Sequence, residues 1–260
     1  MVNLSFSIYD LEYFLLILTR VSCFMFLAPF FSMTNTPTRI RLGLSIFTSV
    51  LLYQVLTPSE VVVADSIFSY SLLVIKEAIT GLLLGFSVNI CMTIVNFAGS
   101  IADMETGLSM ANLIDPTTRE NSSITGVYYQ YIIMLLMIVT GMYRFLLQAI
   151  ADTFKLIPVN GAVFRSENLL ENMVLFLTDY VIIGFRIVLP IFCVMLLLNA
   201  ILGVMAKVSP QMNMFAVGMQ LKILVGLSVL FLTTSLLPGA ADFIFQEMKK
   251  MMTIFTESMM

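Results

Sequence analysis

Residues 173–206 read MVLFLTDYVIIGFRIVLPIFCVMLLLNAILGVMA, and this stretch decides the class of fold. Its second part, residues 187–206, contains no charged side chain. A helix needs about 20 apolar residues to cross the hydrocarbon core of a bilayer, so this part alone is long enough to span one. The stretch therefore predicts a membrane helix that carries two charges, Asp179 and Arg186, and one proline, Pro190.

The composition of the 260-residue chain excludes an ordinary soluble domain. Hydrophobic residues make up 59% and charged residues 11% of the chain, and the mean hydropathy is +0.99. Soluble domains are about half apolar and about a quarter charged. Lipid, partner proteins or both must therefore cover the apolar surface. The net charge of −3 supplies no basic surface for nucleic acid.

Five further apolar stretches flank the first. They are residues 8–31, 42–56, 66–99, 121–143 and 223–241. The alternating pattern of barrel strands is absent, so we expect an all-α integral membrane protein with five or six candidate membrane segments. Residues 42–56 are short for a span and suit either a hairpin arm or a buried helix. Residues 144–172 and the Met-rich tail from Asp242 are mixed in polarity and predict amphipathic helices, and residues 207–215 predict a tight turn.

The positive charges do not give a consistent membrane topology. If Arg39 and Arg41 mark the cytoplasmic side, alternating the loops places Arg144 and Lys155 on the opposite side. Lys249 and Lys250 fall there as well. Either one segment does not span, or the finished protein does not lie across the bilayer in the ordinary way.

Several charged residues interrupt the apolar stretches, where each costs about 2.5–3.5 kcal/mol near a helix centre. Two sequence neighbours, Lys76 and Glu77, could compensate each other, as could Asp179 and Arg186. So many charges favour protein surroundings over free lipid, and a proton relay is the alternative. The residues concerned are Arg20, Lys76, Glu77, Asp179, Arg186, Lys207 and Lys222.

Small and amide-bearing residues recur along one face of the segment that begins at residue 66. Gly81 and Gly85 form a small-xxx-small element, which lets a neighbouring helix approach closely. The spacing fits two interpretations, ordinary packing within the chain and a packing face between subunits of an assembly. The residues of this stripe are Gly81, Gly85, Asn89, Asn96, Gly99, Asp103 and Gly107.

The sequence contains no convincing catalytic motif. The chain has no histidine, which removes the commonest general base and metal ligand. Ser109 lies in a faint GxSxG-like stretch, but the last position is Ala111 and no histidine could activate it. No P-loop is present. The three cysteines lie in apolar runs and suit small buried side chains better than metal ligands. We therefore expect no enzyme, no cofactor and no metal site.

Residues 99–126 read GSIADMETGLSMANLIDPTTRENSSITG and form an unusual connector. Asp115-Pro116 favours a turn that ends the preceding helix. A loop of this length at membrane depth is tolerated only if it is buried in protein or lines a cavity. Both an exposed loop and a plug inside a conduit suit the pattern.

Two stretches resemble a known family. Residues 199–222, NAILGVMAKVSPQMNMFAVGMQLK, fit its "LGxxAR…PQxNxFxxGxxxK" pattern, and residues 98–103, followed by Gly107, Met110 and Asp115-Pro116, fit a second one. The chain resembles the FliR family of flagellar export-gate proteins and their homologues in virulence type III secretion. Lys207 departs from the usual arginine, which keeps the charge but loses the bidentate fork. The positions that fit elsewhere are Arg20, Pro29, Pro37, Arg41, Gly43, Glu77, Gly81 and Gly85.

The resemblance implies a non-enzymatic subunit of the flagellar type III protein export gate, which forms part of the conduit for unfolded flagellar proteins. It implies FliP-like and FliQ-like gate subunits and FlhB-like and FlhA-like export components as partners, with transient unfolded substrates and membrane lipid. It places the chain in the bacterial inner membrane, as a multi-pass protein of the flagellar basal body.

The resemblance also implies a division of the chain. Residues 1–260 would form a single FliR-type domain, with FliP-like helices up to about residue 180 and a FliQ-like hairpin and tail over about residues 181–260. Residues 103–126 would hold the plug of the closed pore. The candidate plug residues are Gly107, Leu108, Met110, Leu113, Ile114, Asp115 and Pro116. The candidate assembly contacts are Gly81, Gly85, Gly99, Asp103, Lys207, Pro210, Gln211, Asn213 and Lys222.

Other functions compete with the export gate. A virulence secretion subunit would share the same patterns. An autonomous transporter or channel would usually show internal repeats and an ionisable site at the midplane, and the sequence shows no repeat. A lipid-embedded enzyme is opposed by the missing histidine.

Overall fold

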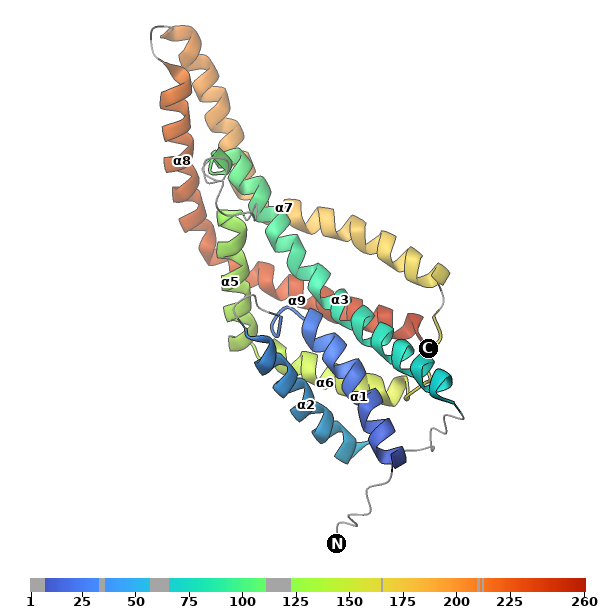
Figure 1. Cartoon of the computed structure of the whole chain (residues 1–260). Coiled ribbons are helices and arrows are strands. Elements are labelled where there is room, and N and C mark those ends of the chain that lie inside the picture. Colours follow the sequence, from blue (N-terminus) through green and yellow to red (C-terminus); the bar gives the residue numbers. More distant parts are fainter. Residues whose placement is uncertain are drawn as a thin grey trace. The chain divides into compact units, whose positions relative to one another are not determined.

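The computed structural model describes residues 8–32, 36–56, 66–110, 123–164, 166–209, 211 and 213–260, apart from the side chains of residues 166–170, 214 and 215. Within these ranges all the regular elements are helices, which confirms the all-α fold class (Figure 1). They are α1 (Ile8–Leu27), α2 (Thr38–Val55), α3 (Ile67–Thr106), α5 (Ile124–Val139), α6 (Met142–Leu156), α7 (Ser166–Val208), α8 (Met214–Thr233), the short 3₁₀ helix η1 (Thr234–Leu236) and α9 (Leu237–Ser258).

The helices form two compact units, and α3, α7 and α9 each contribute residues to both. Unit 1 contains residues 1–90, 141–175 and 246–260, and unit 2 contains residues 91–140 and 176–245. These units do not follow the division near residue 180 that the family resemblance implies. That division concerns likeness to other subunits rather than packing, and it stays a prediction.

Unit 1 is built around α1. Its buried face carries Leu16, Ile17, Val21 and Phe24, each fully buried, at the spacing of one side of a helix. Helix α1 packs against α2, where Tyr13 and Phe14 contact the ring of Tyr53. Helix α6 is amphipathic, as the sequence predicts, and buries Met142, Leu146, Ile150, Thr153 and Phe154.

Unit 2 contains the second half of α3, α5, most of α7, α8 and the start of α9. Phe97 of α3 packs against Tyr180 and Phe185 of α7. Helix α8 runs back beside the second half of α7 (Figure 1), where Gly218 lies against Leu202. The sequence-predicted turn between two apolar helices is therefore confirmed, with α7 ending at Val208 and α8 beginning at Met214.

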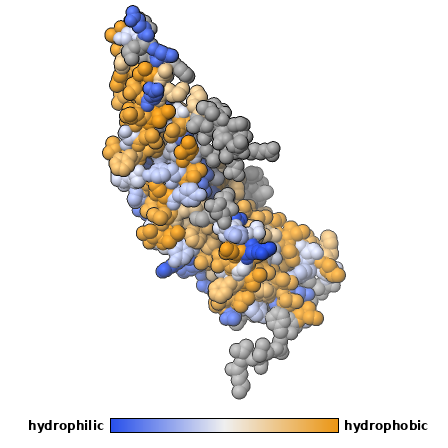
Figure 2. Space-filling view, turned by 60° about the vertical axis from the view of Figure 1, so that its left-hand side comes forward, coloured by the Kyte–Doolittle hydropathy of each residue, from blue (hydrophilic) through white to orange (hydrophobic). Residues whose placement is uncertain are grey.

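Much of the surface is apolar (Figure 2). On the α7–α8 hairpin, Phe231 is 80% exposed and Leu197 66% exposed. Among the described residues, three helical stretches are long and apolar enough to cross a membrane, or four if the broken α5–α6 pair counts as one. This is fewer than the five or six candidates in the sequence, because α1 and α2 are not among them.

Candidate functional site

A buried pair of charges lies at the centre of unit 1. The Nε of Arg20 in α1 donates to Oε2 of Glu77 in α3 over 2.5 Å, and both side chains are fully buried. The guanidinium also donates from Nη1 to the carbonyl oxygen of Ile157 over 2.8 Å, and it packs over the ring of Phe154 at 4.3 Å from the ring centroid. Arg20 therefore joins α1, α3 and the end of α6.

The same pair fixes the turn after α6. Oε1 of Glu77 accepts a hydrogen bond from the backbone N–H of Asn160 over 2.9 Å. Asn160 has a φ of 70°, in the left-handed region that asparagine tolerates better than most residues. Lys76 donates from Nζ to the carbonyl oxygen of Asn160 over 2.7 Å. Two neighbouring side chains of α3, Lys76 and Glu77, therefore hold the turn after α6.

This arrangement answers the charge problem that the sequence raised. A buried ion pair is tolerated when further hydrogen bonds satisfy its remaining donors and acceptors, as they do here. The proposed compensation between Lys76 and Glu77 is replaced by Arg20 with Glu77, while Lys76 bonds the backbone. The sequence shows that Arg20 and Glu77 are opposite charges in two apolar helices, but it does not show that they pair.

The glycine stripe of α3 packs against helices of the same chain. A Cβ atom at Gly81 would collide with the carbonyl oxygen of Arg20, and one at Gly85 would lie 2.8 Å from Cβ of Leu27. Further along, a Cβ at Gly99 would collide with the backbone of Gly126 in α5. Close packing within the chain, which the sequence left open as one interpretation, accounts for the positions of these three glycines.

Asp103 links α3 to the beginning of α5. Its buried carboxylate accepts from the backbone N–H of Thr125 at 3.2 Å and also from the Thr125 hydroxyl. Ser123 is the N-cap of α5 and accepts from the N–H of Gly126 over 2.8 Å. A carboxylate at a helix N-terminus is favoured by the free N–H groups and by the helix dipole. Asp103 thus lies in α3 and anchors α5, and the predicted loop 103–126 is too wide at both ends.

The candidate plug residues divide between described and undescribed parts of the chain. Gly107 follows α3 with a φ of 83°, a left-handed conformation that suits glycine at a helix end. Leu108 is half-buried and Met110 is 46% exposed. Leu113, Ile114, Asp115 and Pro116 lie outside the described residues.

Asn213 caps the start of α8 in the turn between α7 and α8. Oδ1 of Asn213 accepts from the backbone N–H of Ala216 at the start of α8, over 3.4 Å. Lys207 and Gln211 are exposed, and Lys222 is half-buried on α8. Pro210 lies outside the described residues.

Two carboxylates, Glu171 and Glu257, line one polar pocket in the described parts of the chain together with Asn172 and Ser258. No group of three or more Cys, Asp or Glu side chains in these parts of the chain could hold a metal ion. Ser109 lies just beyond α3, and the sequence contains no histidine that could activate it. The three cysteines form no disulfide and lie on three different helices, α1, α3 and α7.

Comparison with known proteins supplies the family. Residues 11–248 match the family described as bacterial export proteins, family 1. The chain belongs to this family. It is 32% identical over 234 residues to the flagellar biosynthetic protein FliR of Bacillus subtilis, and the match covers 89% of this chain and 90% of the relative.

Two further relatives carry different names. The flagellar biosynthetic protein FliR of Escherichia coli is 26% identical over 234 residues, covering 88% of this chain and 87% of the relative. The surface presentation of antigens protein SpaR of Shigella flexneri is 29% identical over 182 residues, covering 69% and 70%. The resemblance to FliR-type export proteins is therefore confirmed.

Proposed function

We propose that the chain is a non-enzymatic subunit of the flagellar type III protein export gate and forms part of the conduit for unfolded flagellar proteins. The observation that carries the proposal is the match to an export protein family over nearly the whole chain, with relatives named as flagellar biosynthetic proteins. The structure is compatible with this role, because the fully buried Arg20–Glu77 pair is satisfied within the chain while the helices expose large apolar side chains.

A virulence type III secretion subunit is the second candidate, favoured by the match to SpaR. The flagellar role has more support, because the match to the Bacillus subtilis FliR is higher in identity and covers 89% of the chain rather than 69%.

The proposed surroundings are a complex with FliP-like and FliQ-like subunits and with FlhB-like and FlhA-like components, in the bacterial inner membrane at the flagellar basal body. An exposed face as apolar as that of α7 and α8 is unusual on a soluble monomer and marks contact with lipid or protein. Lys207, Gln211, Asn213 and Lys222 flank or lie near the turn of this hairpin and are proposed to contact partner subunits.

Purification of the tagged chain with its FliP-like and FliQ-like partners tests the assembly. The wild-type chain is expected to be recovered in a stable complex, identified by native mass spectrometry. Charge reversal by Lys222→Glu should lower recovery at least about tenfold, the effect of about 1.4 kcal/mol. Reversal of the exposed Lys155 on α6 is the control and should leave recovery unchanged. Equal recovery of both variants would exclude Lys222 as a contact, and no complex with any form would contradict the assembly.

We also propose that the segment after Gly107 occludes the closed conduit. The proposal rests on the sequence pattern and on the firm anchoring of its flanks, where Asp103 holds the start of α5. Deletion of residues 110–118 should leave assembly largely intact but make the inner membrane leaky to ions, because weak apolar contacts would no longer seal it. Conductance across membranes that contain the assembled deletion form is the measurement. A normal assembly with no added conductance would leave the segment as a connector.

A further inference from the structure

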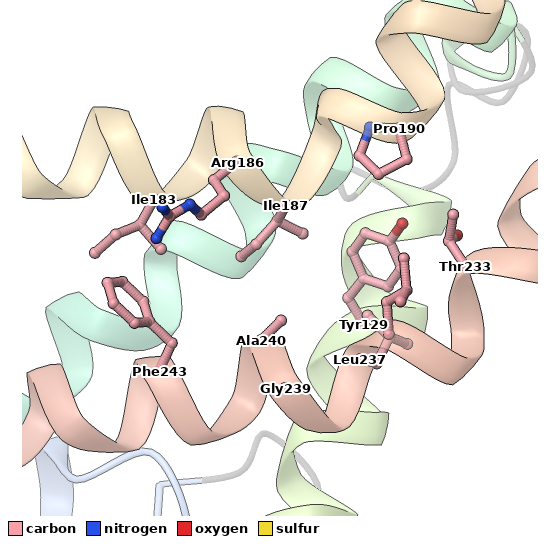
Figure 3. Close-up of a pocket in the computed structure, with 11 residues that line it drawn as sticks. Tyr129, Ile183, Arg186, Ile187, Pro190, Thr233, Leu237, Gly239, Ala240 and Phe243 are labelled. Carbon is pink, nitrogen blue, oxygen red and sulfur yellow. The ribbon is translucent and has the colours of Figure 1, made fainter.

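Unit 2 contains a cavity of about 260 Å³ between α5, the middle of α7 and the start of α9 (Figure 3). Its walls include Ile183, Ile187, Pro190, Leu237 and Ala240. Pockets that enclose drug-sized ligands measure about 300–1,000 Å³, so this cavity admits one end of an elongated molecule better than a whole compact one.

Pro190 explains why a cavity forms beside the middle of α7. A proline inside a helix has no N–H for the carbonyl four residues earlier, which here belongs to Arg186, and its ring bends the helix. Figure 3 shows α7 changing direction beside Pro190. Because of this bend, α7 cannot pack evenly against α9. On α9, the small residues Gly239 and Ala240 leave space at the floor of the cavity.

The two ends of the cavity differ in chemistry. At one end, the exposed guanidinium of Arg186 lies over the ring of Phe243, 5.7 Å from its centroid. Contact with a ring face leaves the in-plane N–H groups of arginine available for a phosphate. At the other end, Tyr129 is buried, with only 2% of its surface exposed, so that end offers little to a polar ligand.

We infer that this cavity binds an anionic membrane phospholipid, with the end of one acyl chain between the apolar walls and the phosphate at Arg186. Among the described residues that line it, none carries a carboxylate, so the rim attracts anions. Basic pockets between membrane helices are known to bind anionic headgroups. The inference does not depend on the export role.

The surrounding surface favours a lipid over a protein segment as the occupant. On the same part of α7, Ile182 is 58% exposed and Leu189 56% exposed, within a stretch apolar enough to cross a membrane. An acyl chain is stabilised by the burial of each CH₂ group and brings no backbone donors or acceptors that an apolar cavity would leave unpaired.

Native mass spectrometry of the full-length chain tests the site. Protein that has been stripped of lipid is exposed to detergent micelles containing phosphatidylglycerol or phosphatidylcholine with the same acyl chains. The wild type should retain one phosphatidylglycerol in preference to phosphatidylcholine. Arg186→Gln should lower retention of phosphatidylglycerol about fivefold, the effect of about 1 kcal/mol for one arginine at an anionic lipid. Arg186→Lys should keep most of it.

Two further variants separate the site from general effects. Arg144 is an exposed arginine that lies over the ring of Tyr143 at 5.6 Å, so Arg144→Gln is a matched control and should retain lipid like the wild type. Gly239→Leu, at a position with open space for a side chain, should fill the floor and reduce retention of both lipids. Excess inorganic phosphate should not displace the lipid.

Four results would overturn the inference. They are equal retention of the two lipids by the wild type, unchanged retention by Arg186→Gln, equal loss in Arg144→Gln, and displacement by inorganic phosphate alone. An Arg186-dependent polypeptide at the site, found when the chain is purified with its partners, would also overturn it. If Arg186→Gln fails to fold, as judged by circular dichroism, Arg186→Lys and Gly239→Leu still decide the outcome.

Discussion

Replacement of Glu77 by alanine is expected to lower the free energy of unfolding by about 3–5 kcal/mol, because it leaves the fully buried guanidinium of Arg20 without its counter-charge. The change also removes the acceptor for the N–H of Asn160, so the turn after α6 loses one of its two supports from α3. Since folded proteins are stable by only about 5–15 kcal/mol, most of the chain should fail to accumulate.

The exposed pair of Lys155 and Asp152 is a matched control. Its N–O distance of 2.7 Å is close to that of the buried pair, but it lies on the surface of α6. Asp152→Ala should cost at most about 1 kcal/mol, because exposed ion pairs contribute little. Unfolding in mild detergent, followed by circular dichroism, measures both variants.

A double variant separates the ion pair from its other bonds. Arg20→Met with Glu77→Leu removes both charges and should be less harmful than the sum of the single changes, because no unpaired charge stays buried. It should still be less stable than the wild type, since the carbonyl of Ile157 and the N–H of Asn160 lose their partners. Equal losses in Glu77→Ala and Asp152→Ala would contradict the account of the buried pair.

The sequence predicts the helices well because their signals are local. Long apolar runs identify α3, α7 and α8, and residues 207–215 indicate the tight turn between α7 and α8. Amphipathic patterns identify α6 and α9. These features depend on residues within a few helical turns of one another, so they can be predicted from one sequence without knowledge of the tertiary contacts.

Pairings between distant residues could not be predicted in the same way. Arg20 and Glu77 are 57 positions apart, and the nearest opposite charge to Glu77 in the sequence is Lys76. The expected loop 103–126 begins too early, because Asp103 looks like the first residue of a polar loop until its bond to Thr125 is known. Both errors come from tertiary contacts that local patterns do not contain.

The glycine spacing correctly predicts a close helix contact but does not identify the helix that makes it. Small residues at Gly81, Gly85 and Gly99 indicate a close helix contact, but the pattern is the same whether the neighbour belongs to this chain or to another. The structure supplies neighbours from α1 and α5 of the same chain. Contacts with other subunits at this face stay a prediction.

Export in living cells tests the central claim most directly. In the organism that encodes the chain, the gene is deleted without altering its neighbours and is then restored on a plasmid as wild type or as the control Arg144→Gln. Flagellar export substrates in the medium and inside the cells are measured by immunoblot. The account predicts that the deletion abolishes secretion while substrates are still made inside the cells, and that both restored forms secrete normally. Undiminished secretion by the deletion strain would contradict the proposal that this chain is part of the export conduit.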